Sequence, residues 1–195
     1  MIKRTIDFLV SLIAIIIIMP VLISVAILIT LDSRGHFLFV QRRIGIDEQE
    51  FLMCKFRTMF IGTPEVATNK LTDSQRYITK IGYYLRKYSI DELPQLFNVL
   101  LGHMSLVGPR PALYNQYDLR QMRQEVGINQ IRPGITGWAQ VNGRDEISLK
   151  EKVHFDLFYL KHQSLLLDLK ILVMTVFNVS SGDGVSKKSS MQKIR

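Results

Sequence analysis

The hydrophobic pattern of this chain is dominated by one long apolar run near its N-terminus. Residues 8–31 carry no charged side chain, and their polar side chains are Ser11, Ser24 and Thr30. As one helix at about 1.5 Å per residue, the run would be about 36 Å long, enough to cross a hydrocarbon core of about 30 Å. A membrane-spanning anchor is therefore one interpretation. A cleaved signal peptide fits less well, because the run is long and no small-residue cleavage site follows it.

A proline and two basic flanks favour a hairpin that enters the membrane and returns. Pro20 cannot donate a hydrogen bond to the carbonyl of Ile16, so a helix must kink there. The two arms, residues 8–19 and 21–31, are each too short to span alone. Cationic residues flank the run on both sides: Lys3, Arg4, Arg34, Arg42 and Arg43. Since cytoplasmic segments are enriched in Lys and Arg, a hairpin with both flanks in the cytoplasm satisfies this preference better than a span.

The pattern after the apolar run predicts a small α+β domain that is mainly helical. Apolar residues with high strand propensity predict two short strands over 36–45 and 50–59, joined by a turn at 46–49. Residues 62–74 are polar and predict a loop. Apolar residues then recur at helical spacing over 74–88 with cationic residues between them, which predicts an amphipathic helix that could lie at a headgroup surface.

Two further helices are expected after Ser148. The second, residues 165–179, is too short and too charged to cross a membrane, so it is expected to be a core or interfacial helix. The tail from Ser180 has the composition of a disordered segment.

The segment with the clearest candidate chemistry is residues 89–111, SIDELPQLFNVLLGHMSLVGPRP. It predicts a helix that ends at Gly102, with Asp91 at the N-cap and Pro94 in the first turn. The apolar stripe of this helix is expected to consist of Leu93, Leu96, Phe97, Leu100 and Leu101.

Adjacent carboxylates at a helix start usually serve only as cap and dipole partners. Here basic residues lie close by in sequence, Arg86 and Lys87 before the pair and Arg110 after it. Cations of this kind keep a carboxylate ionised, as a nucleophile or metal ligand must be. Asp91 and Glu92 together offer the oxygen ligands that suit Mg²⁺.

A second polar motif, IRPGITGWAQVNGR, covers residues 131–144. Structural turns explain its glycines and prolines. Gln140, Asn142 and Arg144 recur at period two, which predicts that they line one face of an extended segment.

Composition narrows the possible partners. The formal net charge is +8 and the isoelectric point is near 9.7, which suits nucleic acid, anionic headgroups or phosphorylated substrates. The long apolar run favours the membrane-side partners, so no nucleic-acid partner is expected. Cys54, the single cysteine, cannot form an intramolecular disulfide, which is consistent with a reducing compartment.

Several motifs resemble the monotopic phosphoglycosyl transferases, a group of bacterial sugar transferases. They are KFRTM at 55–59, the DELPQL block and GPRP within 89–111, RPGITGWAQVNGR at 132–144, and the pattern of the C-terminal helices. The resemblance implies a re-entrant membrane helix over 1–34 that is broken near Pro20, a catalytic domain over 35–179 with interfacial helices, and a flexible tail over 180–195. It also implies a monotopic protein on the cytoplasmic face of a bacterial inner membrane.

The chain departs from the pattern of these transferases at two positions. Met19 stands before Pro20 where a serine is common, and His103 stands where the usual motif has an aspartate. The role of that aspartate, expected to be structural, is therefore in doubt for this chain.

The resemblance also implies a reaction. A sugar-1-phosphate passes from a UDP-sugar to polyprenyl (undecaprenyl) phosphate and UMP is released, with Asp91 as nucleophile and Mg²⁺ near Asp91 and Glu92. An N-acetylated, modified hexosamine is the expected sugar. The substrate-binding residues implied are Arg110, Arg86, Lys55, Arg57, Gln140 and Arg144, of which the last four have structural roles as the alternative.

Two other functions are compatible with the pattern. In a membrane-bound phosphohydrolase of nucleotide sugars, water would replace the lipid acceptor, and sugar-1-phosphate would be released without lipid. In a non-enzymatic basic protein that binds anionic membranes or nucleic acid, phosphate affinity would survive loss of Asp91, because only the cationic residues would matter.

Overall fold

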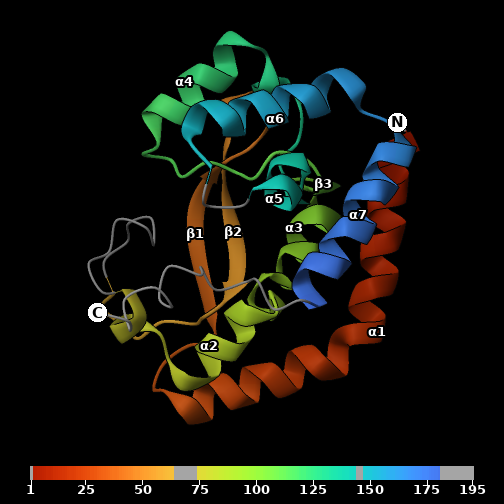
Figure 1. Cartoon of the computed structure of the whole chain (residues 1–195). Helices are drawn as coiled ribbons and strands as arrows, with labels where there is room; N and C mark the ends of the chain where they lie inside the picture. The colour runs from red at the N-terminus through yellow and green to blue at the C-terminus, as the bar shows by residue number, and fades with distance from the viewer. Residues whose placement is uncertain (1, 64–73, 144–146, 181–195) are drawn as a thin grey trace, which may run out of the picture.

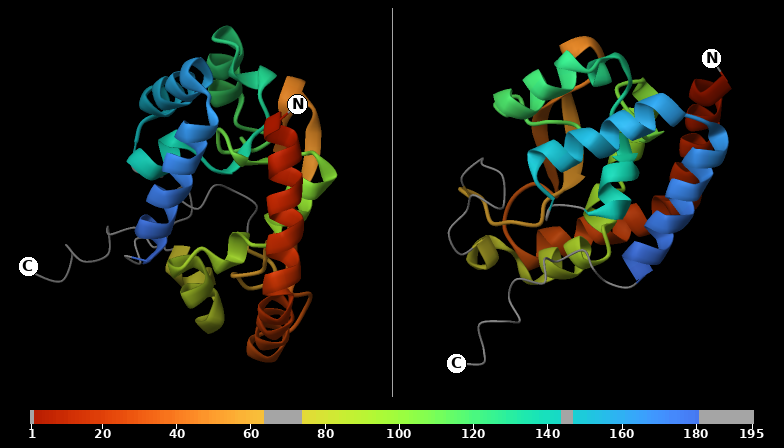
Figure 2. Two further views of the ribbon diagram at one scale, coloured as in Figure 1. Left: turned by 90° about the vertical axis from the view of Figure 1, so that its right-hand side faces the viewer. Right: turned by 45° about the horizontal axis from the view of Figure 1, so that its top comes forward.

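The computed structural model of the protein describes residues 2–63, 74–143 and 147–180 (Figure 1). The apolar run forms one helix, α1 (Ile2–Asp32), which is bent sharply into two arms (Figure 1 and the right-hand view of Figure 2). Pro20 lies inside this helix, and a proline that removes one helical hydrogen bond is the usual cause of such a bend. The predicted kink is thus present, although the helix continues through it. Among the described residues, α1 alone has the length and composition of a membrane-crossing helix.

The two arms of α1 pack against different parts of the domain. The N-terminal arm lies beside α7 (Leu165–Ser180), and the second arm lies beneath α2 (Lys80–Lys87) (Figure 1). The second arm contributes one row of side chains to a core cluster, and the residues of that cluster are Leu22, Val25, Ile29, Phe56 and Leu85. Most other apolar side chains of α1 are exposed.

The predicted hairpin is confirmed. β1 (Leu38–Ile44) pairs antiparallel with β2 (Glu50–Phe56), and the short helix η1 (Ile46–Glu48) forms the turn between them. A second sheet was not predicted: β3 (Ser105–Val107) pairs in parallel with β4 (Gly134–Thr136). These strands are too short to show a sequence pattern, and the 26 residues 108–133 separate them.

The prediction of a single amphipathic helix over 74–88 is wrong in detail. The structure has a 3-10 turn, η3 (Ser74–Tyr77), followed by α2. Ile78 pairs with Met59 as an isolated bridge, and the N–H of Thr79 donates to Thr58 O at 3.0 Å. The Thr79 side chain then caps α2 by accepting from the N–H of Gly82. Tertiary hydrogen bonds therefore interrupt a segment whose side-chain spacing is helical.

The helix expected to start at Asp91 also begins differently. Asp91 lies in a 3-10 turn, η4 (Ile90–Glu92), and α3 (Gln95–Leu101) follows Pro94. The predicted N-cap role of Asp91 is thus wrong, whereas Gly102 ends the helix with a φ of 91° as expected. The buried face also differs from the predicted stripe, because Phe97 and Leu101 are exposed. The buried side chains of α3 are those of Gln95, Leu96, Asn98 and Val99.

The C-terminal third is helical. α4 (Tyr117–Glu125), which was not predicted, is followed by the turn η5 (Ile128–Gln130). α5 (Trp138–Asn142) replaces the predicted extended segment, so Gln140 and Asn142 do not share the face of a strand. The two helices expected after Ser148 are confirmed as α6 (Leu149–His162) and α7. On α7, one side buries Ile171, while Leu166 and Phe177 are exposed on another.

Candidate active site

Two adjacent carboxylates lie in the tight turn between α2 and α3. Asp91 and Glu92 belong to η4, and Ser89 before them has a φ of 53°, in the left-handed region. A positive φ is uncommon for a residue with a side chain and marks a sharp change of chain direction. The turn packs against β2, and Asp91 is only 8% exposed. The two acids are therefore part of the interior rather than a solvated helix start.

Glu92 is held by two cations from separate segments. Lys55 Nζ on β2 and Arg110 NH2 after β3 each lie 2.9 Å from Glu92 Oε1. Arg86, on α2, lies close enough to Asp91 to favour its ionised form. The tertiary structure thus brings Lys55, more than 30 positions away in the chain, to the charged side chains of residues 86–110.

The two carboxyl groups have opposite pKa shifts. Burial, followed by the negative charge of Glu92, raises the pKa of Asp91 to about 6. Burial also acts to raise the pKa of Glu92, but Arg110 and Lys55 outweigh it and hold that pKa well below its usual range. At neutral pH both groups are ionised, and Asp91 is the more basic of the two. A basic, ionised carboxylate is the form that a nucleophile requires.

The loop that carries Arg110 is held against the segment that contains β4. The N–H of Gly108 donates to Thr136 O at 2.8 Å, and the N–H of Gly134 donates to Pro109 O at 2.9 Å. A Cβ on Gly134 would lie 2.1 Å from the backbone nitrogen of Gly108, so the two backbones are in direct contact. The glycines of RPGITG thus permit a close approach that no side chain would allow, and this approach places Arg110.

Asp91 and Glu92 suit a metal ion whose other ligands come from a substrate better than one that is held by protein ligands alone. Within residues 2–63, 74–143 and 147–180, no three His, Cys, Asp or Glu side chains cluster as ligands. Glu92 Oε1 already accepts from two cations, which leaves Asp91 and the second oxygen of Glu92 as ligands. Mg²⁺ is commonly bound by one or two carboxylates together with substrate phosphates and water. The pair therefore suits Mg²⁺ that is bound jointly with a phosphorylated substrate.

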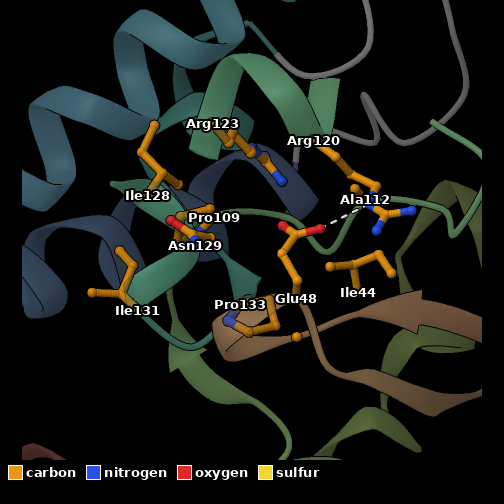
Figure 3. A pocket seen from close by; sticks show the side chains of 11 residues that line it. Ile44, Glu48, Pro109, Ala112, Arg120, Arg123, Ile128, Asn129, Ile131 and Pro133 are labelled. Atoms are coloured by element: carbon orange, nitrogen blue, oxygen red, sulfur yellow. Dashed lines mark hydrogen bonds and ion pairs between the residues drawn. The ribbon is translucent and has the colours of Figure 1, made fainter. Parts of the chain in front are cut away.

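A small cavity is lined by Pro109 and Ala112, which flank Arg110 in the chain, and its lining does not include Asp91 or Glu92 (Figure 3). Its volume is about 30 Å³, and its walls include Pro109, Arg123 and the ion-paired Glu48 and Arg120. Ligand pockets commonly measure about 300–1,000 Å³. This cavity has room for a water molecule but not for a nucleotide sugar.

A comparison with known families shows which family the chain belongs to. A family described as bacterial sugar transferase matches residues 1–182 of the chain. The chain belongs to the bacterial sugar transferase family. The match includes every segment that contributes to the carboxylate pair and its cations, so the resemblance seen in the motifs is confirmed.

Among relatives of this chain, the UDP-glucose:undecaprenyl-phosphate glucose-1-phosphate transferase of Escherichia coli K12 is 39% identical over 184 residues, which cover 91% of this chain and 40% of the relative. The UDP-N-acetylgalactosamine-undecaprenyl-phosphate N-acetylgalactosaminephosphotransferase of Aeromonas hydrophila is 38% identical over 94% of this chain and 44% of its own length. The chain thus spans about two fifths of these relatives. The uncharacterized sugar transferase EpsL of Bacillus subtilis is 42% identical over 86% of this chain and 81% of its own length.

Two of the residues predicted to bind substrate, Arg57 and Gln140, make their described contacts outside the carboxylate cluster. Arg57 is buried and donates to the backbone carbonyls of Ser33 and Arg34, at 2.7 and 2.6 Å, so it supports the chain where α1 ends. Gln140 donates to Ile135 O at 3.2 Å from α5, a contact that supports the β4 segment. Arg144 lies outside the described residues. Substrate contact by these three residues stays a prediction.

Two buried amide side chains of α3, those of Gln95 and Asn98, were not predicted from the sequence. Asn98 donates to Leu52 O at 2.7 Å and accepts from the N–H of Cys54 at 3.0 Å, which fastens α3 to the open edge of β2. Gln95 is 1% exposed, and its Nε2 has no hydrogen-bond partner among the described residues. An amide in an otherwise apolar stretch was the only signal for either residue, and such a residue is normally expected to face solvent.

Proposed function

We propose that this sugar transferase moves a sugar-1-phosphate from a UDP-sugar to a polyprenyl phosphate and releases UMP. The names of the relatives describe transfers of this kind to undecaprenyl phosphate. The observation that carries the proposal is the buried pair of Asp91 and Glu92 among three cations. A buried carboxylate beside groups of the kind that bind phosphate supports the proposal that Asp91 is the nucleophile.

The proposed chemistry is a double displacement at one phosphorus atom. A carboxylate oxygen of Asp91 attacks the phosphorus that bears the sugar, and the bond from that phosphorus to the UMP oxygen breaks. UMP leaves with the bonding electrons, and Asp91 carries the sugar phosphate. A phosphate oxygen of the polyprenyl phosphate then attacks the same phosphorus, the bond to Asp91 breaks, and polyprenyl-diphosphate-sugar is formed.

The cations around the pair have distinct tasks in this scheme. Arg110 is the most exposed partner of Glu92, with its side chain 33% exposed, so it can meet a substrate phosphate while it still contacts Glu92. Lys55 is mostly buried and keeps Glu92 ionised. Arg86 on α2 would face the lipid phosphate. Asp91 and Glu92 would hold Mg²⁺, which would neutralise charge on the diphosphate and on departing UMP.

The order of release tests the double displacement. Wild-type protein with Mg²⁺ and UDP-sugar but no polyprenyl phosphate is expected to exchange labelled UMP into the UDP-sugar pool and to release about one UMP per site. UDP-glucose and UDP-N-acetylhexosamines form the donor panel, because the relatives' names include both kinds and an N-acetylated hexosamine is the sugar expected from the family resemblance. Absence of exchange in protein that turns over normally with lipid would contradict the covalent intermediate but not the transferase. Sugar-1-phosphate release without lipid would favour the phosphohydrolase.

The same proposal places the protein on one face of a bacterial inner membrane, because both ends of α1 are bonded to one domain. Near the N-terminus, Lys3 Nζ lies 2.6 Å from Asp168 Oδ2 on α7. The carboxylate of Asp7 is buried and accepts from Ser105 Oγ at 2.7 Å. At the other end, Asp32 accepts from the N–H of Ile81 at 3.0 Å.

These contacts are hard to reconcile with a straight span. A straight helix of 31 residues would be about 46 Å long and would separate its ends by more than a hydrocarbon core of about 30 Å. The bent helix keeps both ends on the domain and exposes apolar side chains along both arms. A helix that dips into one leaflet and returns satisfies both observations.

Topology mapping tests this placement. Reporter tags before α1 and after Asp32 are both expected to report the cytoplasm in the wild type. Pro20→Leu restores the missing backbone donor and permits a straight helix, so a fraction of molecules is expected to expose the N-terminus on the outer side. Met19→Leu, next to the proline, is the control and is expected to keep the wild-type topology. A wild-type N-terminus outside the cell would contradict the re-entrant helix.

A further inference from the structure

The loop Gly108–Pro111 presents three successive carbonyl groups that each meet a different donor. Pro109 O accepts from the N–H of Gly134 at 2.9 Å. Arg110 O accepts from Arg123 NH1 at 2.9 Å, and Pro111 O accepts from Arg43 NH1 at 3.0 Å. Two residues of this loop are prolines, which have no N–H, so the loop cannot form regular backbone pairing of its own. Its conformation therefore depends on donors from outside.

Arg123, the donor to Arg110 O, is itself fixed by a buried ion pair. Its NH2 and Nε lie 2.6 and 3.1 Å from Asp156 Oδ2 on α6. Arg123 is 7% exposed and Asp156 is 1% exposed. A guanidinium is planar and presents several N–H groups in a fixed geometry. With Nε and NH2 held by one carboxylate, Arg123 has little freedom in where an N–H of NH1 points. That N–H points at the Arg110 backbone.

We propose that Arg123, oriented by Asp156, and Arg43 are positioning residues that set the reach of the Arg110 side chain toward Glu92. Neither touches the carboxylate pair in the structure. Each acts on the backbone at or next to Arg110, whose guanidinium lies 2.9 Å from Glu92 Oε1. A small displacement of a group that orients a reacting phosphate can cost on the order of 100-fold in rate.

A purely structural role is the competing explanation, since a buried ion pair between α4 and α6 also joins two helices. Replacing Arg123 alone would leave Asp156 buried without its partner and could unfold the protein. The paired change Arg123→Met with Asp156→Leu removes both charges and keeps apolar volume, which is often tolerated. It removes the donor to Arg110 O without leaving a buried charge.

The experiment compares this paired variant with a matched control on the same helix. Arg120→Met removes an arginine that also binds a carboxylate, Glu48 at 2.9 Å, and a backbone carbonyl, Tyr114 O at 2.6 Å, but not the Arg110 loop. We expect the paired variant to lose about 10- to 100-fold in kcat/KM for transfer, with the same split between kcat and KM as Arg110→Ala. Arg120→Met is expected to keep wild-type rates.

A second variant covers failure of the paired variant to fold. Arg43→Met removes the donor to Pro111 O from the half-buried Arg43 on β1, and Arg42→Met, at the next position of the strand, is its control. Arg42 lies over the Tyr114 ring and near Glu50 rather than at the loop. Arg43→Met is expected to show a smaller loss with the same kcat and KM pattern.

Activity in an Arg110→Ala background separates a positioning role from a purely structural one. In an Arg110→Ala background, neither the paired change nor Arg43→Met should reduce activity further, because the side chain they position is absent. Equal losses in both backgrounds would overturn the proposal.

The activity measurements rest on the proposed function, so amide hydrogen exchange of residues 108–113 is measured in parallel. Faster exchange of this peptide in the paired variant and in Arg43→Met, but not in the controls, is expected. Unchanged exchange in both positioning variants would overturn the proposal. If both variants exchange faster but the wild-type protein shows no transferase activity, only the proposed function is contradicted.

Discussion

Asp91→Asn is expected to abolish sugar-phosphate transfer and UMP exchange while making the metal-free protein more stable near neutral pH. The amide cannot act as the nucleophile, so both half-reactions are lost. The stability gain follows from the raised pKa of Asp91, about 6 in the fold against about 3.9 in an unfolded chain. Above both values the ionised carboxylate costs the folded state stability, and the amide removes that cost.

The stability gain has a defined pH window. It is expected to reach roughly 3 kcal/mol at most above pH 7 and to disappear as pH falls from about 6 to about 4, where wild-type Asp91 is protonated in both states. Thermal unfolding in EDTA across this range measures it, and radiolabelled transfer measures activity. Asp118→Asn, an exposed acid at the start of α4, is the control for both. A fully active Asp91→Asn protein would show that the nucleophile lies elsewhere.

Glu92→Gln is expected to lower kcat/KM by about 100-fold or more. The carboxylate joins Lys55 and Arg110 at one oxygen, and an uncharged amide neither offsets these two cations nor supplies a ligand for Mg²⁺. Loss of the neighbouring negative charge also lowers the pKa of Asp91, which makes the nucleophile less basic. The buried Lys55 loses its counter-charge, so the free energy of unfolding is expected to fall by roughly 1–3 kcal/mol.

Glu48→Gln is a closely matched control for Glu92→Gln. Glu48 accepts from Arg120 at the same distance of 2.9 Å, and its side chain is similarly buried, 22% exposed against 17% for Glu92. It lies in the β1–β2 turn and does not contact the carboxylate pair. Equal activity losses in the two variants would mean that loss of an ion pair, rather than loss of this carboxylate, explains the effect.

The local elements were predictable where side-chain pattern and backbone preference agree. The two strands of the hairpin, the end of α3 at Gly102 and the two C-terminal helices follow from short-range rules. The bend of α1 follows from one proline. Predictions were wrong where a long-range hydrogen bond overrides the local pattern, as at Thr79, whose N–H pairs with Thr58 and interrupts the expected helix.

The candidate site divides in the same way. Asp91, Glu92 and Arg110 could be found from motifs, because their charges are concentrated in one segment of 23 residues, 89–111. The structural role of Arg57 and the contribution of Arg123 and Asp156 could not, since each depends on a partner at least 22 positions away or on a backbone carbonyl that has no sequence signature. The helical backbone at Gln140 was misjudged because a period of two in three residues is too little to exclude a helix.

The sequence by itself determined the family, the apolar helix with its bend, and the pair of acids beside a basic segment, because these depend on residue identity and on neighbours in the chain. Only the tertiary structure decided the surroundings of the two acids. It buries Asp91, brings Lys55 from β2 and Arg110 from the β3 loop onto one oxygen of Glu92, and so separates the two pKa values. Burial and charge proximity act through space over a few ångströms, and this chain brings such groups together only when α1, the hairpin and the glycine-lined loop have packed.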